Sequence, residues 1–284
     1  MKRSTKNILL ILLILAILVA VYYFYTQSNQ EQPIDGKLPV PELEDDENVK
    51  PSKTAAFKAD FNLPFPIAEN QVLVRPFYTL SYNKEHAQAD WVAYKMFPFP
   101  DSLSVKRKDA FRPDPLIEGG SATLGDYKKS GYDRGHLAPA KALSFSKESM
   151  SESFYMSNMS PQVPMFNRGI WRFLEAQVYS WSKESDSLYV VTGPVLNDPL
   201  GTIGDNEVSI PHSYYKTIVR FKDGNISGIG FLLKNEKSPQ SFFDFVTSID
   251  SVEQATGIDF YAQFPEELQN RIEANKEVSS FAVE

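Results

Sequence analysis

The sequence predicts an α+β fold with a mainly antiparallel sheet and flanking helices. Aromatic and β-branched runs typical of strands occur in clusters, and segments with helical spacing lie between these clusters. No regular alternation of strand, helix and strand is present, which favours the α+β class.

The strand-like runs fall into two groups on either side of a central helical segment. They occupy residues 71–82, 90–97, 188–192, 214–221 and 226–233. The first two predict an antiparallel pair. The last two predict a hairpin, because the Asp223-Gly224 pair between them is a strong signal for a two-residue turn. Residues 106–123 contain Pro113, Pro115 and paired glycines, which is typical of a loop.

Helices are predicted over residues 167–183, 242–256 and 265–275. Gly257 is a plausible C-terminal cap for the second helix, and Pro265 suits the start of the third. In the first helix, one stripe of side chains repeats at helical spacing: Ile170, Phe173, Leu174, Gln177, Val178 and Trp181. Trp171 and Phe173 are expected in the core.

Composition limits the kinds of site that the chain can build. Of its 284 residues, 42% are hydrophobic and 13% aromatic, enough for a sizeable core. The absence of cysteine excludes disulfides and thiolate chemistry. With only His86, His136 and His212 available, a multi-histidine zinc site is difficult to assemble.

The N-terminal part has a different composition from the rest. Residues 1–25 combine basic residues with an uncharged run from Ile8 to Tyr25, which predicts a transmembrane anchor with the remainder outside the cytoplasm. A cleaved signal peptide, and hence a secreted protein, is the alternative. Residues 26–60 are rich in proline and acidic residues and predict a flexible linker. The folded domain is expected over residues 61–284.

Charge is distributed unevenly. The formal net charge is -7, which argues against a polyanionic partner, yet residues 106–172 hold eleven Lys and Arg against seven Asp and Glu. This basic excess surrounds Asp133, Arg134, Gly135 and His136. In an extended segment Arg134 and His136 would share one face and Asp133 the other, which places a cation and a possible base together.

Further motifs lie downstream of Asp-Arg-Gly-His. They are Asn-Met-Ser-Pro-Gln at 158–162, Phe-Asn-Arg-Gly-Ile-Trp at 166–171, Leu-Glu at 174–175 and Val-Thr-Gly-Pro at 191–194. As a set, these motifs resemble the DNA/RNA non-specific endonuclease family, which includes secreted bacterial nucleases and mitochondrial endonuclease G. The resemblance spans residues 78–264. It implies a ββα-metal (His-Me) finger within a larger α+β domain, and hydrolysis of phosphodiester bonds in DNA and RNA.

The resemblance also implies roles for five residues. His136 corresponds to the general base, Asn167 to the direct metal ligand and Glu175 to a residue that contacts the metal through water. Arg134 and Asn158 correspond to residues that assist at the phosphate. The implied cofactor is Mg²⁺, with Mn²⁺ as an alternative, and no protein partner is implied.

Elementary chemistry agrees with these residue types. Mg²⁺ is a hard ion that keeps several waters, so one amide oxygen can suffice as its direct protein ligand. On an ideal helix, Asn167 and Glu175 differ by about 80° around the axis and about 12 Å along it, which favours a water-mediated role for Glu175. Taken singly, Asn167 is also typical of a helix N-cap, and Arg134 of a surface ion pair.

Some features leave alternatives open. Arg168 follows Asn167 where the family usually has glutamine, which adds a cation beside the predicted metal. Arg107, Lys108 and Arg112 are all candidates for substrate contact. Two other functions remain compatible with the sequence: a surface protein that binds nucleic acid without cleaving it, and a phosphodiesterase for small or lipid-linked substrates.

Overall fold

The computed structural model describes residues 63–64 and 69–281. The predicted anchor and linker, residues 1–25 and 26–60, lie outside the described residues. In the part that is described, none of the helices combines the length and the apolar character needed to cross a membrane.

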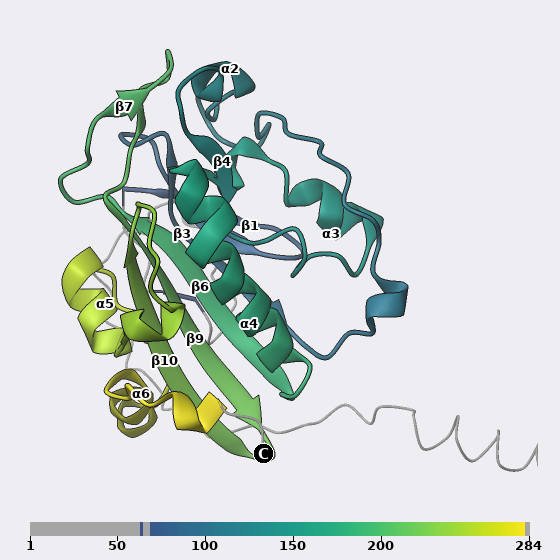
Figure 1. Ribbon diagram of the computed structural model, residues 1–284, viewed down its shortest axis with the longest axis vertical. Helices are drawn as coiled ribbons and strands as arrows, with labels where there is room; N and C mark the ends of the chain where they lie inside the picture. Colours follow the sequence, from purple (N-terminus) through teal and green to yellow (C-terminus); the bar gives the residue numbers. More distant parts are fainter. Residues whose placement is uncertain (1–62, 65–68, 282–284) are drawn as a thin grey trace, which may run out of the picture. The chain divides into compact units, whose positions relative to one another are not determined.

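A seven-stranded sheet in the order β1-β2-β3-β6-β9-β10-β11 forms the centre of the fold (Figure 1). All neighbouring strands in it are antiparallel. Its strands are β1 (Gln71–Val74), β2 (Thr79–Asn83), β3 (Gln88–Met96), β6 (Ser187–Val195), β9 (Ser213–Lys222), β10 (Asn225–Lys234) and β11 (Val246–Thr247). The predicted α+β class and antiparallel sheet are confirmed.

Helices lie against this sheet and in the connections between its strands. They are α2 (Leu124–Tyr127), α3 (Lys147–Glu152), α4 (Arg172–Ser182), α5 (Ile249–Thr256) and α6 (Glu266–Glu273). Shorter turns of 3-10 helix are η1 (Asp101–Leu103), η2 (Met156–Asn158), η4 (Phe242–Phe245) and η5 (Val278–Phe281), and η3 (Phe166–Trp171) is a π-helical turn that leads into α4. Two small two-stranded sheets pair β4 (Asp133–His136) with β5 (Met159–Gln162) and β7 (Thr202–Ile203) with β8 (Val208–Ser209).

The central sheet is buried on both faces. Successive side chains of a strand point to opposite faces, so Val190 and Ile218 join the core under α4, whereas Val191 and Val219 join the core under α5 and α6. Figure 1 shows α4 lying along the sheet, with α5 and α6 at another side of it. The fold therefore has three layers: α4 on one face of the sheet, the sheet itself, and α5 with α6 on the other face.

Most predicted strands are present with altered boundaries. The run 71–82 is divided by a turn in which Arg75 N donates to Tyr78 O at 3.0 Å, because Pro76 interrupts the strand. The predicted hairpin is confirmed: β9 and β10 pair through a turn whose central residues, Asp223 and Gly224, have φ of 49° and 76°. Positive φ at both positions explains the Asp-Gly pair.

Two helix predictions need correction. The segment 242–256 is not one helix, because Ser248 caps a new helix by accepting a hydrogen bond from Ser251 N, and only Ile249–Thr256 is α-helical. Its predicted cap is confirmed, since Gly257 has φ 72°. In the first helix, Trp171 is buried as expected, but Phe173 is 55% exposed, with the Arg172 guanidinium 5.0 Å from its ring centre.

Candidate functional site

The small sheet of β4 and β5 and the helix that follows it form a ββα unit. Asp133, Arg134, Gly135 and His136 pair with Gln162, Pro161, Ser160 and Met159, respectively. A side chain at Gly135 would place its Cβ 2.1 Å from Gln162 Cδ, so this close pairing requires glycine. The unit presents the end of β4 to the beginning of the helix.

Hydrogen bonds fix this unit to the central sheet. Ser160 Oγ in β5 lies 2.5 Å from Gln88 Oε1 in β3 and 2.6 Å from Tyr214 Oη in β9. Tyr214 Oη also donates to the carbonyl oxygen of Pro161 at 2.9 Å. All of these side chains are buried, so the bonds hold the strand in place beneath the site.

His136 is a buried histidine surrounded by aromatic rings. Its ring centre lies 5.0 Å from that of Phe154 and 5.7 Å from that of Phe111. Burial lowers the pKa of His136 to about 3, and the charges of Arg107 and Arg134 add to this effect. Its Nε2 has no hydrogen-bond partner among the described residues. The imidazole is thus neutral at physiological pH, which is the protonation state that a general base requires.

Asn167 lies in the π-helical turn, and its side chain does not cap the helix. Its amide nitrogen donates to Asp133 Oδ2 at 2.9 Å. Within the described part of the chain, this bond leaves the amide oxygen of Asn167 without a hydrogen-bond partner and fixes its direction. The N-cap alternative for Asn167 is therefore wrong.

Arg168 forms an ion pair with the same carboxylate, so its charge is neutralised by Asp133. Its Nε and Nη2 donate to Asp133 Oδ2 and Oδ1 at 2.8 and 2.6 Å. Hydrogen bonds from Arg168 and Asn167 outweigh partial burial, so they lower the pKa of Asp133. Asp133 lines the same cleft as Arg134 and His136, which corrects the prediction that it faces the other way. The hydrogen bonds from Asn167 and Arg168 hold the Asp133 side chain on this side of the strand.

Glu175 lies two turns further along the helix and is half-buried. Burial raises its pKa to about 7, whereas the nearby charge of Lys216 opposes this rise. Lys216 comes from β9, is fully buried, and donates to Thr192 Oγ1 at 2.5 Å and Tyr94 Oη at 3.3 Å. Its ammonium lies 4.9 Å from the centre of the Trp171 ring. The charge of a buried lysine thus acts on the Glu175 carboxylate.

Asn158 does not reach the cleft, which corrects its predicted role at the phosphate. It is completely buried, and its Oδ1 accepts from Ala138 N at 2.9 Å. Its Nδ2 donates to the carbonyl oxygens of Ala138 and Ser153 at 3.0 and 2.9 Å. All of its polar capacity is directed to the backbone that follows His136, so Asn158 positions that segment.

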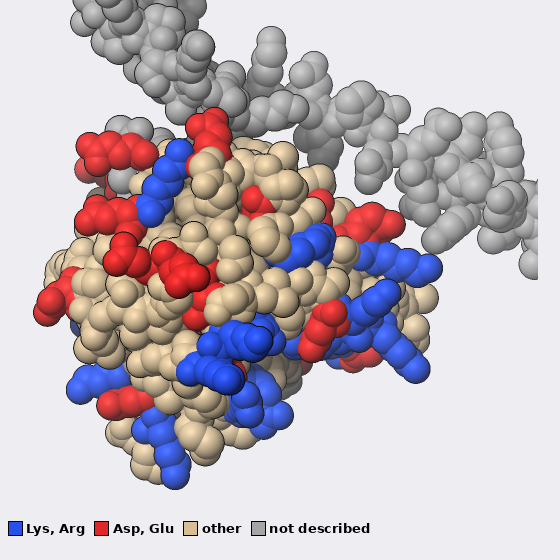
Figure 2. Space-filling model, turned by 90° about the horizontal axis from the view of Figure 1, so that it is seen from above, with Lys and Arg blue, Asp and Glu red and all other residues tan. Residues whose placement is uncertain are grey.

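One cleft of about 660 Å³ brings the remaining predicted site residues together. It is lined by Arg107, Asp109, Phe111, Asp133, Arg134, His136, Pro139, Ala140, Lys141, Asn167, Arg168, Arg172 and Glu175. Five of these residues are basic and three are acidic. Figure 2 shows one face of the molecule, on which basic side chains gather in the lower part of the view and acidic side chains predominate at the upper left.

The loop before α2 supplies one cation to this cleft. Arg107 lines it and lies 2.7 Å from Asp109 in an ion pair. Arg112 instead donates to the carbonyl oxygens of Ala110 and Ser151, both at 2.9 Å, and Lys108 does not line the cleft. The guanidinium of Arg134 lies 4.3 Å from the centre of the Phe111 ring, which orients it within the cleft.

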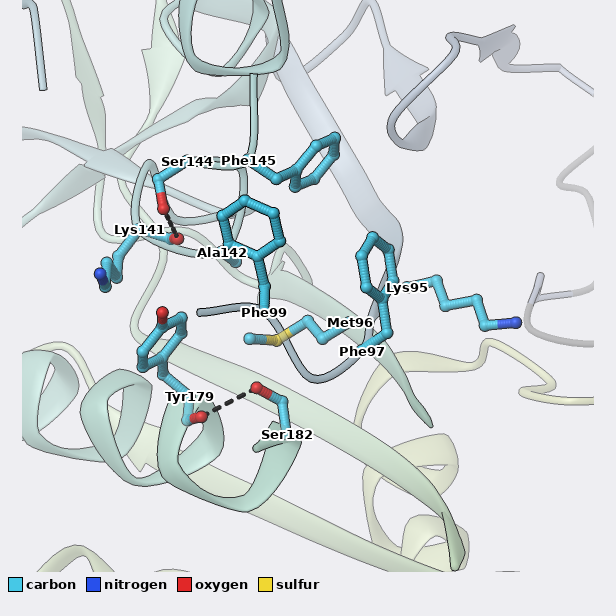
Figure 3. Close-up of a pocket in the computed structure, with 10 residues that line it drawn as sticks. All are labelled: Lys95, Met96, Phe97, Phe99, Lys141, Ala142, Ser144, Phe145, Tyr179 and Ser182. Atoms are coloured by element: carbon cyan, nitrogen blue, oxygen red, sulfur yellow. Dashed lines mark hydrogen bonds between the residues drawn. The ribbon is translucent and has the colours of Figure 1, made fainter. Parts of the chain in front are cut away.

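A second hollow of about 310 Å³ adjoins the cleft and shares Pro139, Lys141, Arg172 and Glu175 with it. Beyond Lys141 and Tyr179 is a pocket that Figure 3 shows lined by Phe97, Phe99 and Phe145. Its free volume is about 10 Å³, room for roughly one water. This aromatic cluster is therefore packing and offers no space for a ligand of its own.

The donor atoms of the cleft fit a hard divalent cation. Asn167 offers an amide oxygen and Glu175 a carboxylate, both preferred by Mg²⁺. Among the described residues, His136 is the only histidine that lines the cleft, so a zinc site with several histidines does not fit. The sequence missed Asp133, Lys141, Arg172 and Lys216 as members or neighbours of the site. The one feature of the sequence that could have indicated a role for Lys216 is the presence of a lysine within a buried strand.

Residues 58–267 match the family described as DNA/RNA non-specific endonuclease. A nuclease from Nostoc sp. is 32% identical over 72% of this chain and 78% of its own length. Nuclease C1 from Cunninghamella echinulata is 33% identical over 69% of this chain and 84% of its length. Human mitochondrial endonuclease G is 31% identical over 67% of this chain and 69% of its length.

A solved structure resembles the fold as well. A chain in the crystal structure of an EndoG/EndoGI complex superposes with a TM-score of 0.65 and is 31% identical. The superposition covers 75% of this chain and 94% of that one.

Proposed function

This chain belongs to the DNA/RNA non-specific endonuclease family and is a metal-dependent endonuclease, and we propose that its reaction takes place in the cleft between β4 and the helix from Asn167 to Glu175. The observation that carries the proposal is that His136, Arg134, Asn167 and Glu175 line this one cleft. These side chains come from two segments that the ββα unit brings together.

His136 acts as the general base. Its neutral imidazole takes a proton from the attacking water, and the aromatic rings of Phe111 and Phe154 hold the imidazole in one orientation. A base that is already neutral at pH 7 needs no prior deprotonation. The unpartnered ring nitrogen supports this assignment.

Asn167 would hold the catalytic metal directly through its amide oxygen, and Glu175 would hold it through an intervening water. Mg²⁺ is the proposed ion and Mn²⁺ a substitute, because both accept oxygen ligands. When bound, the ion stabilises the negative charge that develops on the phosphate and leaving oxygen. Asp133 keeps the Asn167 oxygen directed at the ion by binding its amide nitrogen.

Two arginines of the cleft bind the phosphate of the substrate. Arg134 and Arg107 both line it, and a guanidinium matches the geometry of phosphate oxygens. In the adjoining hollow, Lys141 and Arg172 supply positive charge that suits the next part of the nucleic-acid backbone. Contacts to phosphate carry no sequence information, which agrees with cleavage of DNA and RNA without strong sequence preference.

The test uses the purified full chain on plasmid DNA and on RNA with Mg²⁺. Both substrates should be cut, and His136→Ala should reduce turnover by at least about 100-fold, the range of general base catalysis. His212→Ala is the matched control, because His212 does not line the cleft. Equal turnover by the His136→Ala variant would sink the assignment.

The same preparations separate the two alternative functions. Binding of nucleic acid without cleavage in Mg²⁺ and in Mn²⁺ would indicate a binding protein. Faster turnover of small or lipid-linked diesters than of polynucleotides would indicate a phosphodiesterase of another kind.

For localisation, we propose that residues 1–25 anchor the chain in a membrane with the nuclease domain outside the cytoplasm. The support is the uncharged run from Ile8 to Tyr25 and the basic residues before it. Membrane fractionation and protease treatment of intact cells test this. Release of a mature protein that begins after residue 25 would favour secretion instead.

A further inference from the structure

Three acidic side chains gather at the contact between α5 and α6. Asp250 and Glu253 belong to α5, and Glu273 is the last residue of α6. Each offers one carboxylate oxygen, and these oxygens all lie within 4.8 Å of one another. No ion pair among the described residues involves any of the three, so no lysine or arginine neutralises them.

The group lies on the face of the sheet opposite to the catalytic cleft. Ile249 and Val252 of α5 and Ile272 of α6 pack in the core on one face, whereas Leu174 and Val178 of α4 pack in the core on the other. The acidic group is therefore separate from Asn167 and Glu175, and it has no part in the mechanism proposed above.

Glu273 carries the evidence that this is more than a solvated acidic surface. The residue is only 5% exposed, and its buried Oε1 has no hydrogen-bond partner among the described residues. Exposed acidic groups often lie close together without an ion, so the buried oxygen matters most. A carboxylate oxygen that is removed from water without a partner costs free energy. By contrast, Glu253 Oε1 accepts from Phe260 N at 2.8 Å.

The surrounding backbone holds the end of α6 close to the sheet. Asn275, just after α6, donates to the carbonyl oxygen of Gly228 in β10 at 2.7 Å. A Cβ at Gly228 would lie 2.3 Å from the carbonyl oxygen of Ile272, so glycine lets the end of α6 approach the sheet closely. Glu273 is thus brought to α5 by main-chain packing that does not depend on the carboxylates.

Two occupants can neutralise such a group, a proton or a cation. Burial, together with the charge of Glu253, raises the pKa of Glu273 to about 8, so the proton is a real competitor. Among cations, Ca²⁺ suits the site better than Mg²⁺. It accepts six to eight oxygens in flexible geometry, whereas Mg²⁺ demands near-ideal octahedral geometry.

We propose that Asp250, Glu253 and Glu273 form a structural Ca²⁺ site that joins α5 to α6. Three protein carboxylates supply part of the coordination, and water supplies the remainder. A cation bound here would stabilise the folded chain, because the three carboxylates are close together only in the folded state.

The experiment uses the full chain, freed of metal by chelator and then given CaCl2 alone. Calorimetric titration should show a saturable Ca²⁺ site, and the melting temperature should rise by about 5 °C at a Ca²⁺ concentration about one hundred times Kd. Glu273→Gln should remove both effects while Mg²⁺-dependent nuclease turnover remains. Asn167→Ala is the matched control and should keep both effects, because it changes only the catalytic cleft.

Failure of this proposal is distinguishable from failure of the proposed catalytic site. Equal Ca²⁺ titration and melting shift in Glu273→Gln and the unmodified chain would overturn it, as would loss of both effects in Asn167→Ala. No Ca²⁺ effect in the unmodified chain, with a melting temperature that depends on pH alone, would assign the group to a shared proton. If Glu273→Gln does not fold, Asp250→Asn, on the partly exposed side of the group, decides between the same outcomes.

Discussion

Asn167 donates a hydrogen bond of 2.9 Å from its side-chain nitrogen to Asp133 Oδ2. This bond joins the first residue of β4 to the turn that begins the site helix. Because an amide has one nitrogen and one oxygen at its end, engaging the nitrogen determines where the oxygen points. Asp133 therefore orients the amide oxygen of the proposed metal ligand.

Replacement of Asp133 tests this orientation. Asp133→Ala should raise the Mg²⁺ concentration needed for half-maximal turnover by about 10- to 100-fold, the range for residues that orient a metal ligand. Arg168→Ala is the control, because it removes the ion pair but leaves the bond between Asp133 and Asn167. Mg²⁺ titration of turnover measures both. Equal shifts in the two variants would show that the ion pair with Arg168, not the orientation of Asn167, is the contribution of Asp133.

Asn158 should affect stability and not phosphate binding. Asn158→Ala removes three hydrogen bonds to buried backbone groups, and the free energy of unfolding should fall by roughly 3 kcal/mol. Denaturant unfolding measures the loss. Below the unfolding range, the folded enzyme should keep its KM for nucleic acid. Unchanged stability together with a large rise in KM would return Asn158 to the substrate site.

Lys216 should set the pH at which Glu175 becomes ionised. The pKa of Glu175 is raised to about 7, so at limiting Mg²⁺ turnover should fall as pH decreases through about 7 and the carboxylate gains a proton. His136, with a pKa of about 3, contributes no such fall near neutrality. Lys216→Met should move the fall to higher pH because the opposing positive charge is lost.

The pH dependence of kcat/KM at fixed low Mg²⁺ checks the effect of Lys216. Lys216→Arg keeps the charge and is the matched control. A profile for Lys216→Met that coincides with that of the unmodified chain would mean that the lysine serves packing alone.

Glu273 should make stability depend on pH in the absence of divalent cations. Its carboxyl has an ordinary pKa of 4.5 in the unfolded chain and about 8 in the folded one, so the folded state binds the extra proton between these values. The stability associated with that proton is complete at low pH and is lost as pH rises toward about 8. In chelator, melting temperatures measured from pH 5 to pH 8 should fall less in Glu273→Gln than in the unmodified chain. Parallel curves would contradict the raised pKa.

Local signals predicted much of the fold. The Asp223-Gly224 turn and the Gly257 cap each depend on neighbouring residues, and both are present. The helix predicted from Asn167 begins instead as a π-helical turn that kinks at Gly169, and the regular α-helix starts at Arg172. The boundary near Ser248 was missed because Phe242–Phe245 has apolar spacing compatible with a helix. Phe173 fitted the apolar stripe of α4, yet it lies beside Arg172 at the surface, since packing against the sheet decides which side chains are buried.

The sequence by itself determined the antiparallel α+β class and the residue types of the candidate site, because strand composition, turn residues and motif spacing are local properties. Only the tertiary structure decided which of those residues meet. It placed His136 and Asn167 in one cleft. It buried Asn158, whose side chain bonds the backbone that follows His136, and it brought the charge of Lys216 in β9 to act on Glu175. The physical reason is that burial and charge at a site depend on segments far apart in the chain, whose approach is fixed by the packing of helices on both faces of one sheet.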